Sequence, residues 1–421
     1  MNRLKLFLKE KNFKVLVGNF LSLTVLQVLN ILLPFLTIPY LFRVVGVEKF
    51  GLISFALAFV TFFQIVIEYG FNTISTRDIS IVSHDKKAVQ QTFNEVLSTK
   101  LFLLTILTLV FVMVIFGIPK FRADILVYLF TYIMVIGQVL FPIWLFQGLQ
   151  QMKYITYINV VFKTLCTLLI FVLVKHESQY YYAPLLTSLG FVLSGIASLW
   201  VVKKKFDIHF SFCTFEQVKT QLNKARYLFL SEFQIALIAN ANVLIIGFLL
   251  NATAVGYYAT AEKVIRAVSN LQAPIINAFY PYISKLMQEN KMKANQYIKK
   301  LVKYGGLVDV LGLIVLFILS EFIFKLLFGD QTEESILVFR IMIAFPLLSF
   351  VDQLFGKLVL LTNNKENLFF KIFFYTSIVS VVLCVGLTYS FGFVGTAIAS
   401  TIAQLILALG MWYYARPYLN S

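Results

Sequence analysis

The amino-acid sequence predicts an all-α polytopic membrane protein, with about twelve transmembrane helices in two six-helix lobes around a central cavity. Of its 421 residues 59% are hydrophobic and only 13% are charged. The mean hydropathy of +0.83 exceeds what the core of a soluble domain requires. Apolar runs of about 20 residues, the length that crosses a bilayer core, recur along the chain. They do not alternate as the strands of a transmembrane barrel would.

Each predicted span is an apolar run between polar or charged residues. The runs cover residues 15–42, 50–71, 93–118, 124–148, 154–174, 180–202, 226–250, 255–284, 301–327, 335–361, 368–390 and 393–415. The first run is too long for the core of a signal peptide and no A-x-A-like site follows it, so we expect a retained span. The cysteines lack C-x-x-C spacing and predict neither a disulfide framework nor a metal site.

The basic residues predict the orientation of the chain. Lys and Arg gather at the N-terminus, in the loops 72–92 and 203–226, and in the stretch 285–303. The loops of the opposite side hold far fewer of them. The positive-inside rule therefore places both termini in the cytoplasm. Topology and anionic lipid account for the net charge of +16, so we expect no nucleic-acid partner.

Short sequence matches across the middle of the chain predict an internal repeat. "FGLISFA" from Phe50 matches "VGYYATA" from Val255, and "FPIWL" from Phe141 matches "FPLLS" from Phe345. Both pairs lie roughly 200 residues apart, as expected of a repeated unit. We predict an N-terminal six-helix lobe (1–202), a cytoplasmic linker (203–225) and a C-terminal six-helix lobe (226–421). Parallel repeats of this kind are typical of transporters that alternate access to a site between two bundles.

Polar residues follow one face of several predicted spans. Glu262, Arg266, Asn270 and Asn277 in the eighth span are spaced by whole helical turns, and the first span carries Asn30 in a similar stripe. A charged side chain at the centre of a bilayer costs at least about 2.5 kcal/mol, so it normally faces a bundle interior or a water-filled cavity. These faces therefore predict polar surfaces inside the bundle.

Two interpretations of Arg266 stay open from the sequence. In the first, Glu262 and Arg266 lie one turn apart and form a structural ion pair. In the second, Arg266 lines a cavity and binds an anionic group, because a guanidinium engages a phosphate with two parallel hydrogen bonds. Further within-span cations are Lys163, Lys263, Arg340 and Lys357, with Lys100 at a span edge. The within-span acids are Glu68, Glu232, Glu262, Asp309 and Asp352.

No residue pattern predicts an enzyme. The three histidines fall in loops, and the chain has no nucleophile motif, no metal-ligand spacing and no phosphate-binding glycine loop. We therefore expect a membrane transporter with no metal and no cofactor.

Three stretches carry a resemblance to a known family. "LPFLTIPYLFRVVGVEKFGLISFA" (33–56), "YGFNTISTRDIS" (69–80) and "FPIWLFQGLQQMKYIT" (141–156) resemble the Wzx-type polysaccharide-biosynthesis flippases. That family belongs to the multidrug, oligosaccharidyl-lipid and polysaccharide exporter superfamily. The resemblance runs through nearly the whole chain.

The resemblance implies a flippase that moves an undecaprenyl-diphosphate-linked oligosaccharide from the cytoplasmic to the outer leaflet of a bacterial inner membrane, for O-antigen or capsule synthesis. Its expected partners are the lipid-linked oligosaccharide, membrane lipids, and a polymerase and other polysaccharide-assembly proteins. We expect Arg266, Lys263, Lys163 and Lys357 to hold the diphosphate. Asn30, Asn270, Asn277 and Tyr257 are candidate glycan contacts. A proton or sodium gradient would drive exchange, with Glu68, Asp309, Asp352 and Glu262 as candidate coupling residues.

Two alternatives remain at this stage. A multidrug exporter would share the fold, because fold does not settle function, but organic cations favour an acidic or aromatic cavity over a basic one. A membrane polymerase or ligase of the same pathway would need a long extracytoplasmic loop, which the predicted spans do not leave.

Overall fold

The computed structural model describes residues 11–330 and 332–420, and within them it contains helices and no strand. The α-helices are α2 (Lys11–Glu68), α3 (Phe71–Ile81), α4 (Lys86–Gly117), α5 (Pro119–Arg122), α6 (Ile125–Leu140), α7 (Ile143–Gly148), α8 (Met152–Leu173), α9 (Tyr182–Phe206), α10 (Phe215–Leu249), α11 (Ala252–Asn270), α12 (Ala273–Glu289), α13 (Lys291–Ile318), α14 (Ser320–Phe328), α15 (Glu333–Ile341), α16 (Phe345–Gln353) and α17 (Glu366–Asn420). Short turns of other helix types are η1 (Glu177–Gln179), the π-helix η2 (Leu354–Leu360) and η3 (Leu361–Asn363). The predicted all-helical fold is confirmed.

The two longest helices are each interrupted by a glycine. A continuous helix of the 58 residues of α2 would be about 87 Å long, far more than a bilayer needs. Gly46 interrupts it with a φ of 75°, and Gly392 interrupts α17 with a φ of 63°. These left-handed conformations are cheap for glycine only. Each helix therefore contains two of the predicted spans.

Eight helices among the described residues are long and apolar enough to cross a membrane, or nine if the bent pair Phe215–Leu237 and Asn240–Leu249 counts as one span. Two of the eight are the glycine-interrupted helices. The predicted span 255–284 corresponds to α11 and α12, neither of which is among these helices. The chain is a multi-pass membrane protein.

The chain divides into two compact units. The first comprises Met1–Gly46 and Ala56–Ala236, and the second comprises Val47–Phe55 and Leu237–Ser421. These boundaries differ from those of the predicted lobes. The division into two six-helix lobes stays a prediction. The connection between α9 and α10 is also shorter than the predicted linker, because 203–206 complete α9 and 215–225 begin α10.

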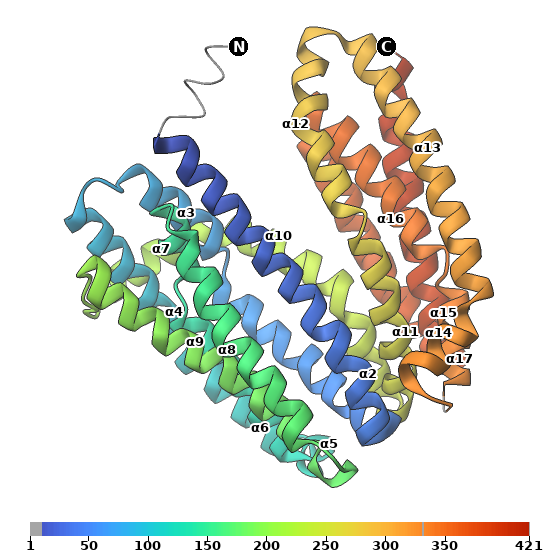
Figure 1. Ribbon diagram of the computed structural model, residues 1–421, viewed down its shortest axis with the longest axis horizontal. Helices are drawn as coiled ribbons and strands as arrows, with labels where there is room; N and C mark the ends of the chain where they lie inside the picture. Colours follow the sequence, from blue (N-terminus) through green and yellow to red (C-terminus); the bar gives the residue numbers. More distant parts are fainter. Residues whose placement is uncertain (1–10, 331, 421) are drawn as a thin grey trace. The chain divides into compact units, whose positions relative to one another are not determined.

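In the first unit, α9 packs against both α6 and α8 (Figure 1). A Cβ atom at Gly137 of α6 would lie 2.4 Å from the backbone of Phe191, so only glycine allows α6 and α9 to approach this closely. Small residues commonly permit such contact between membrane helices, where no hydrophobic effect drives association. Aromatic rings fill the space nearby, with Phe111 stacked on Tyr132 at 4.0 Å between centroids.

In the second unit, residues 47–55 pack against the start of α11. A Cβ atom at Gly51 would lie 1.9 Å from the carbonyl oxygen of Ala252 and 2.6 Å from the backbone nitrogen of Gly256. Gly51 and Gly256 occupy the same position in the matched segments "FGLISFA" and "VGYYATA". The two segments that suggested a repeat therefore contact each other directly.

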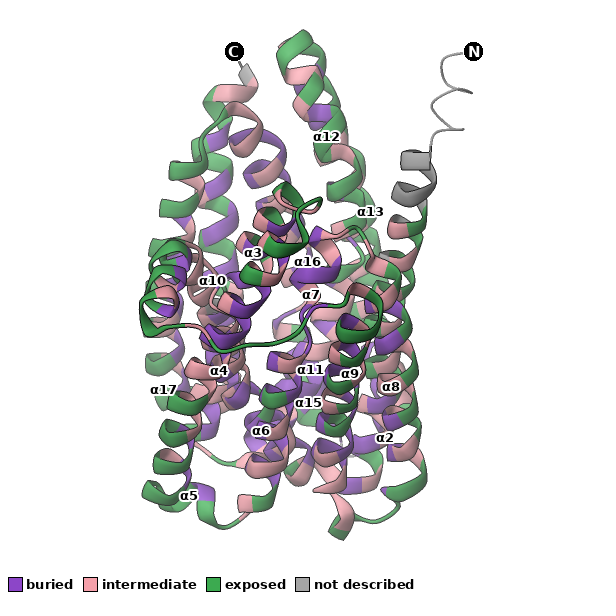
Figure 2. Cartoon of the chain, turned by 90° about the vertical axis from the view of Figure 1, so that its left-hand side faces the viewer, coloured by how far each residue is buried: buried purple, intermediate pink, exposed green. Residues whose placement is uncertain are grey.

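An aliphatic and aromatic core holds the rest of the second unit together. It joins α12 and α13 to α16, η2 and α17, with Leu354, Leu358 and Met411 fully buried. Outward faces of the long helices, α17 among them, remain exposed (Figure 2). Apolar side chains cover much of these faces, as expected where lipid replaces water.

Candidate substrate site

Arg266 and Glu262 form an ion pair on α11. Arg266 donates from Nε and Nη2 to Oε1 of Glu262, at 3.1 and 2.8 Å. Only 9% of the Glu262 side chain is exposed, whereas 39% of the Arg266 side chain is. The structure therefore contains the ion pair that the first interpretation requires. Because part of the Arg266 side chain is exposed, the anion-binding interpretation stays open as well.

Lys263 directly follows Glu262 on α11, so its side chain leaves the helix in a different direction. Its Nζ donates to Oγ of Ser54 at 3.1 Å and lies 4.4 Å from the centre of the Phe50 ring. A hydroxyl and an aromatic face both stabilise an ammonium without neutralising it. Among the described residues no carboxylate lies within ion-pair distance of Lys263. Its charge is thus held in place but not compensated by a direct partner.

Lys357 lies in the π-helix η2, close to the buried Asp352. Its Nζ donates to Oε1 of Gln353 at 3.4 Å, while Oδ2 of Asp352 accepts a hydrogen bond from Nε2 of Gln404. Asp352 is 6% exposed. π-Helical turns often occur at functional positions, and this one contains Lys357 and begins two residues after Asp352.

Lys163, the fourth predicted cation, belongs to α8 of the first unit. Its Nζ lies 4.4 Å from the centre of the Phe191 ring on α9. In the part of the chain that the structure describes, no carboxylate pairs with it. Lys163 therefore resembles Lys263 in its surroundings, but it is in the other unit.

The predicted glycan contacts are mostly exposed. Asn30, Asn270 and Asn277 have exposed side chains, and Tyr257 is half-buried with its ring 5.7 Å from that of Phe393. Tyr258, in contrast, is fully buried. Its hydroxyl accepts a hydrogen bond from Asn242 at 3.0 Å, which makes it part of the core of the second unit.

Glu68 is the acid of a buried ion pair in the first unit. Nζ of Lys100 lies 2.6 and 3.0 Å from the two carboxylate oxygens. The Lys100 side chain is 1% exposed and that of Glu68 is 13% exposed. A second acid, Glu232 of α10, interacts with both charges and accepts a hydrogen bond from the backbone N–H of Gly70. Lys100 thus pairs directly with Glu68, and Glu232 lies near this pair.

Asp309 has only an amide at hydrogen-bond distance among the described residues. Nε2 of Gln272 donates to its Oδ2 at 3.1 Å. Of the four predicted coupling residues, Glu68 and Glu262 are therefore paired with cations, whereas Asp309 and Asp352 are paired with glutamine side chains. None of these roles is tested by the geometry, and all four stay predictions.

Sequence reasoning missed the partners that complete these sites. Lys100, Gln272 and Gln404 lie 32, 37 and 52 residues from the acids that they contact. No local spacing links such distant residues. The only available signal was the cost of burying a polar group in a membrane helix, which predicts that a partner exists but not which residue it is.

Two of the three stretches that carry the family resemblance, 69–80 and 141–156, contact each other. Oγ1 of Thr76 on α3 lies 3.2 Å from Oε1 of Gln147 on α7. A Cβ atom at Gly148 would lie 2.6 Å from the side chain of Ile79. The stretches 69–80 and 141–156 thus form one packed element of the first unit.

Comparisons with known proteins identify the family. A family model described as "Polysaccharide biosynthesis protein" matches residues 16–287. The chain is 28% identical over 405 residues to a protein of Escherichia coli (strain K12) that carries the provisional name O-antigen transporter, covering 94% of this chain and 96% of the relative.

Two solved structures share the fold. An inward-facing multidrug resistance MATE family transporter of the MOP superfamily has a TM-score of 0.74 at 16% identity, covering 92% of this chain and 94% of that one. The lipid II flippase MurJ in an inward closed conformation has a TM-score of 0.68 at 12% identity, with 96% and 87% covered. Because the family model matches more than half of the chain, the protein belongs to the polysaccharide biosynthesis protein family that its sequence resembles.

Proposed function

We propose that the protein is a flippase that translocates an undecaprenyl-diphosphate-linked oligosaccharide from the cytoplasmic to the outer leaflet, by alternating access. The family match over residues 16–287 and a relative named for O-antigen transport support this substrate class. The bacterial inner membrane, with both termini in the cytoplasm, is the location that the distribution of basic residues favours. O-antigen and capsule are both products that this reaction would serve.

Arg266 carries the proposed binding of the diphosphate. Its guanidinium is held at one side by Glu262 and still exposes 39% of its side chain. A guanidinium oriented by one carboxylate is fixed in position, so it loses little side-chain entropy when it binds a second anion. Lys263, one turn earlier, adds a positive charge that no carboxylate of the described residues neutralises directly. Lys163 and Lys357 are the secondary candidates.

Coupling to a proton or sodium gradient is assigned to Asp309 and Asp352 in preference to Glu68 and Glu262. A transported cation must be able to neutralise its carboxylate and leave again. Direct salt bridges oppose this at Glu68 and Glu262. The carboxylates of Asp309 and Asp352 have amide partners, although Lys357 also interacts with Asp352 at longer range. Collapsing the proton gradient, and separately the sodium gradient, in a translocation assay tests this assignment.

The test of the substrate is to delete the gene and determine on which leaflet lipid-linked repeat units accumulate. The proposal expects complete units on the cytoplasmic face and their export on return of the wild-type gene. Accumulation on the outer face would instead indicate a polymerase or ligase. No accumulation, together with altered drug sensitivity, would indicate a multidrug exporter.

Variants of the ion pair test the site. Arg266→Ala is expected to lower export by tenfold or more at normal protein abundance, because a hydrogen bond to a charged group contributes about 1.5–3 kcal/mol. Arg266→Lys should retain part of the export. If the pair were only structural, Glu262→Gln would reproduce the loss, and both variants would lower abundance. Lys285→Ala, which removes an exposed cation from α12, is the matched control.

A further inference from the structure

The connection between α9 and α10 is bound along the side of α4 in a regular ladder. We call residues 207–214 the strap. Three backbone N–H groups of the strap, on every second residue, donate to side chains of α4 on every fourth residue. The donors and acceptors are His209 to Gln90 at 2.9 Å, Ser211 to Asn94 at 3.1 Å, and Cys213 to Ser98 at 3.1 Å.

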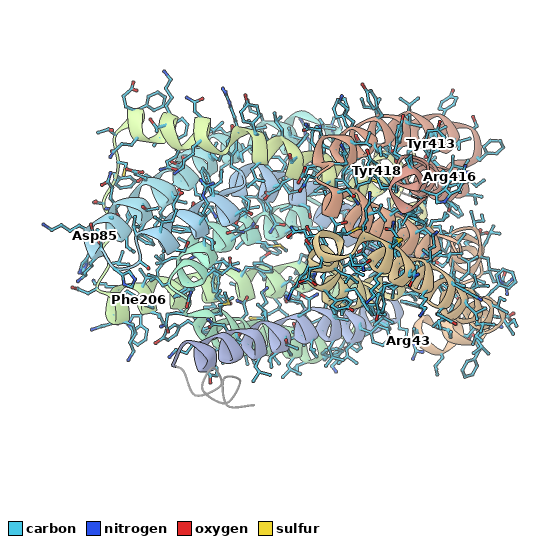
Figure 3. All side chains as sticks on the ribbon, turned by 90° about the horizontal axis from the view of Figure 1, so that it is seen from above. Arg43, Asp85, Phe206, Tyr413, Arg416 and Tyr418 are labelled. Atoms are coloured by element: carbon cyan, nitrogen blue, oxygen red, sulfur yellow. The ribbon has the colours of Figure 1, made fainter. Side chains whose placement is uncertain are left out.

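The ladder works because the two repeats have nearly the same length. Four residues of an α-helix rise about 6.0 Å, and two residues of an extended chain span about 6.6 Å. Gln90 and Asn94 also donate back to the strap, to the carbonyl oxygen of His209 and to Oγ of Ser211. At the far end Lys86 pairs with Asp207. Asp85 and Phe206 accordingly lie at the same end of the first unit (Figure 3).

The ladder also sets the depth of the strap relative to the membrane. The uncharged apolar run of α4 begins at Leu101. Along the helix axis Ser98 lies about 4.5 Å, Asn94 about 10.5 Å and Gln90 about 16.5 Å before that point. The headgroup layer of a bilayer is about 5–8 Å thick on each side. The rung at Ser98 therefore lies at headgroup level. The stretch between the Ser98 and Asn94 rungs lies at the outer edge of that layer, and His209 lies well beyond it.

Aromatic side chains of this segment are left uncovered. Phe212 is 81% exposed, although it lies between the Asn94 and Ser98 rungs of the ladder. Its ring contacts that of Phe210 at 4.9 Å between centroids. Phe215, the first residue of α10, is also exposed and its ring contacts Phe102, within the apolar run of α4. Large apolar groups held at this level face lipid rather than water.

A run of lysines precedes the strap. Lys203, Lys204 and Lys205 form the last turn of α9 and are exposed. Among the described residues none of them pairs with a carboxylate. Lysines at a helix C-terminus complement the helix dipole, so they alone would indicate no ligand. Together with the exposed phenylalanines, these lysines are complementary to the surface of a bilayer, whose interior is apolar and whose headgroups are negatively charged.

We propose that the strap is a membrane-surface anchor, in which Phe212 and Phe215 insert into the cytoplasmic leaflet and Lys203–Lys205 bind anionic lipid headgroups. Each basic residue near an anionic surface contributes about 1 kcal/mol, or roughly fivefold in lipid affinity. The ladder to α4 holds the aromatic side chains at a constant depth. The anchor does not depend on which substrate is transported.

Spin labels at single cysteines in the full-length protein test the depth. Phe212→Cys is labelled in a Cys213→Ser background, because Cys166 and Cys384 are buried. The protein is reconstituted in vesicles of phosphatidylethanolamine and phosphatidylglycerol, and collisions with oxygen and with a water-soluble nickel chelate are compared. His209→Cys, beyond the headgroup level, is the water control, and Val112→Cys, exposed in the apolar run of α4, is the lipid control.

The expected result is a severalfold higher ratio of oxygen to nickel collisions at residue 212 than at residue 209, approaching the ratio at residue 112. Equal ratios at 212 and 209 would overturn the anchor. Ordering of the label only after other assembly proteins are added would assign the surface to a protein partner and would also overturn it.

The lysines are tested by exchanging the lipid. Lys203, Lys204 and Lys205 are replaced together by glutamine, and phosphatidylcholine replaces phosphatidylglycerol in parallel samples. The ratio at residue 212 should fall in phosphatidylcholine, and the glutamine variant should no longer distinguish the two lipids. The same ratio in both lipids for the unaltered lysines would refute the role of the lysines.

Discussion

The buried pair of Lys100 and Glu68 allows a strong test of the packing of the first unit. Lys100→Met removes an ammonium that is 1% exposed and lies 2.6 Å from a carboxylate that is itself 13% exposed. Removing one partner of a buried pair costs about 3–5 kcal/mol, because the other charge remains buried without compensation. Glu232 lies nearby and repels Glu68, and Lys100 offsets part of this repulsion at longer range. We therefore expect a loss within that range.

The structure also predicts an order among the variants. Glu68→Gln should be less destabilising than Lys100→Met, because Glu232 still balances the lysine. The double variant should be more stable than the sum of the single effects predicts, since it leaves only Glu232 unpaired. Equilibrium unfolding in mixed detergent micelles, followed by circular dichroism, measures each free energy of unfolding.

An exposed pair on the same chain is the control. Lys285 and Glu289 lie 3.6 Å apart with side chains 77% and 59% exposed. Lys285→Met should change the free energy of unfolding by less than about 1 kcal/mol. Equal stability of Lys100→Met and Lys285→Met would refute the reasoning. So would a double variant at Lys100 and Glu68 whose loss equals the sum of the single losses.

Three further predictions follow from the packing and from the strap. Gly51→Ala should destabilise the second unit, because the new Cβ would lie 1.9 Å from a carbonyl oxygen of α11, whereas Gly312→Ala, with nothing within 4 Å, should be neutral or stabilising by about 1 kcal/mol; thermal unfolding of the two variants checks this. The pKa of the Asp207 carboxyl lies below its ordinary value because neighbouring cations hydrogen-bond to it. Because the folded pKa is lowered, the ionised carboxyl stabilises the strap at pH values above its ordinary pKa and stops doing so as the pH falls through the folded pKa; the protection factors of the strap amides, taken relative to the intrinsic exchange rate at each pH, should therefore fall in acid, and Asp207→Asn should show the lower protection already at neutral pH. Asn94→Ala removes both hydrogen bonds of the Ser211 rung, at about 1 kcal/mol each, and should raise hydrogen exchange of the strap by an order of magnitude or more; an equal effect of Gln91→Ala, on another face of α4, would contradict this.

Much of the architecture follows from local features of the sequence. Apolar length and the spacing of polar residues predicted membrane helices at almost every place where the structure has them. The short matches around Gly51 and Gly256 predicted a repeat, and these two glycines contact each other in the fold. Such inferences succeed because helix length and helical periodicity depend only on neighbouring residues.

Other features depend on residues that meet only in the folded chain. Sequence spacing predicted the pair of Glu262 and Arg266, which lie one turn apart, but not Lys100 beside Glu68 or Gln404 beside Asp352. The difference matters for function, because it separates carboxylates neutralised by a salt bridge from those that are not.

The sequence by itself determined that this chain is a multi-pass helical membrane protein of a polysaccharide biosynthesis family, because composition, periodicity and motifs are written in consecutive residues. Only the tertiary structure decided which charges are paired and how the segment 207–214 is bound. The sequence predicted residues 203–225 only as a cytoplasmic linker. Its backbone is fixed to Gln90, Asn94 and Ser98, because an extended chain and an α-helix meet there in register over more than a hundred residues of sequence separation.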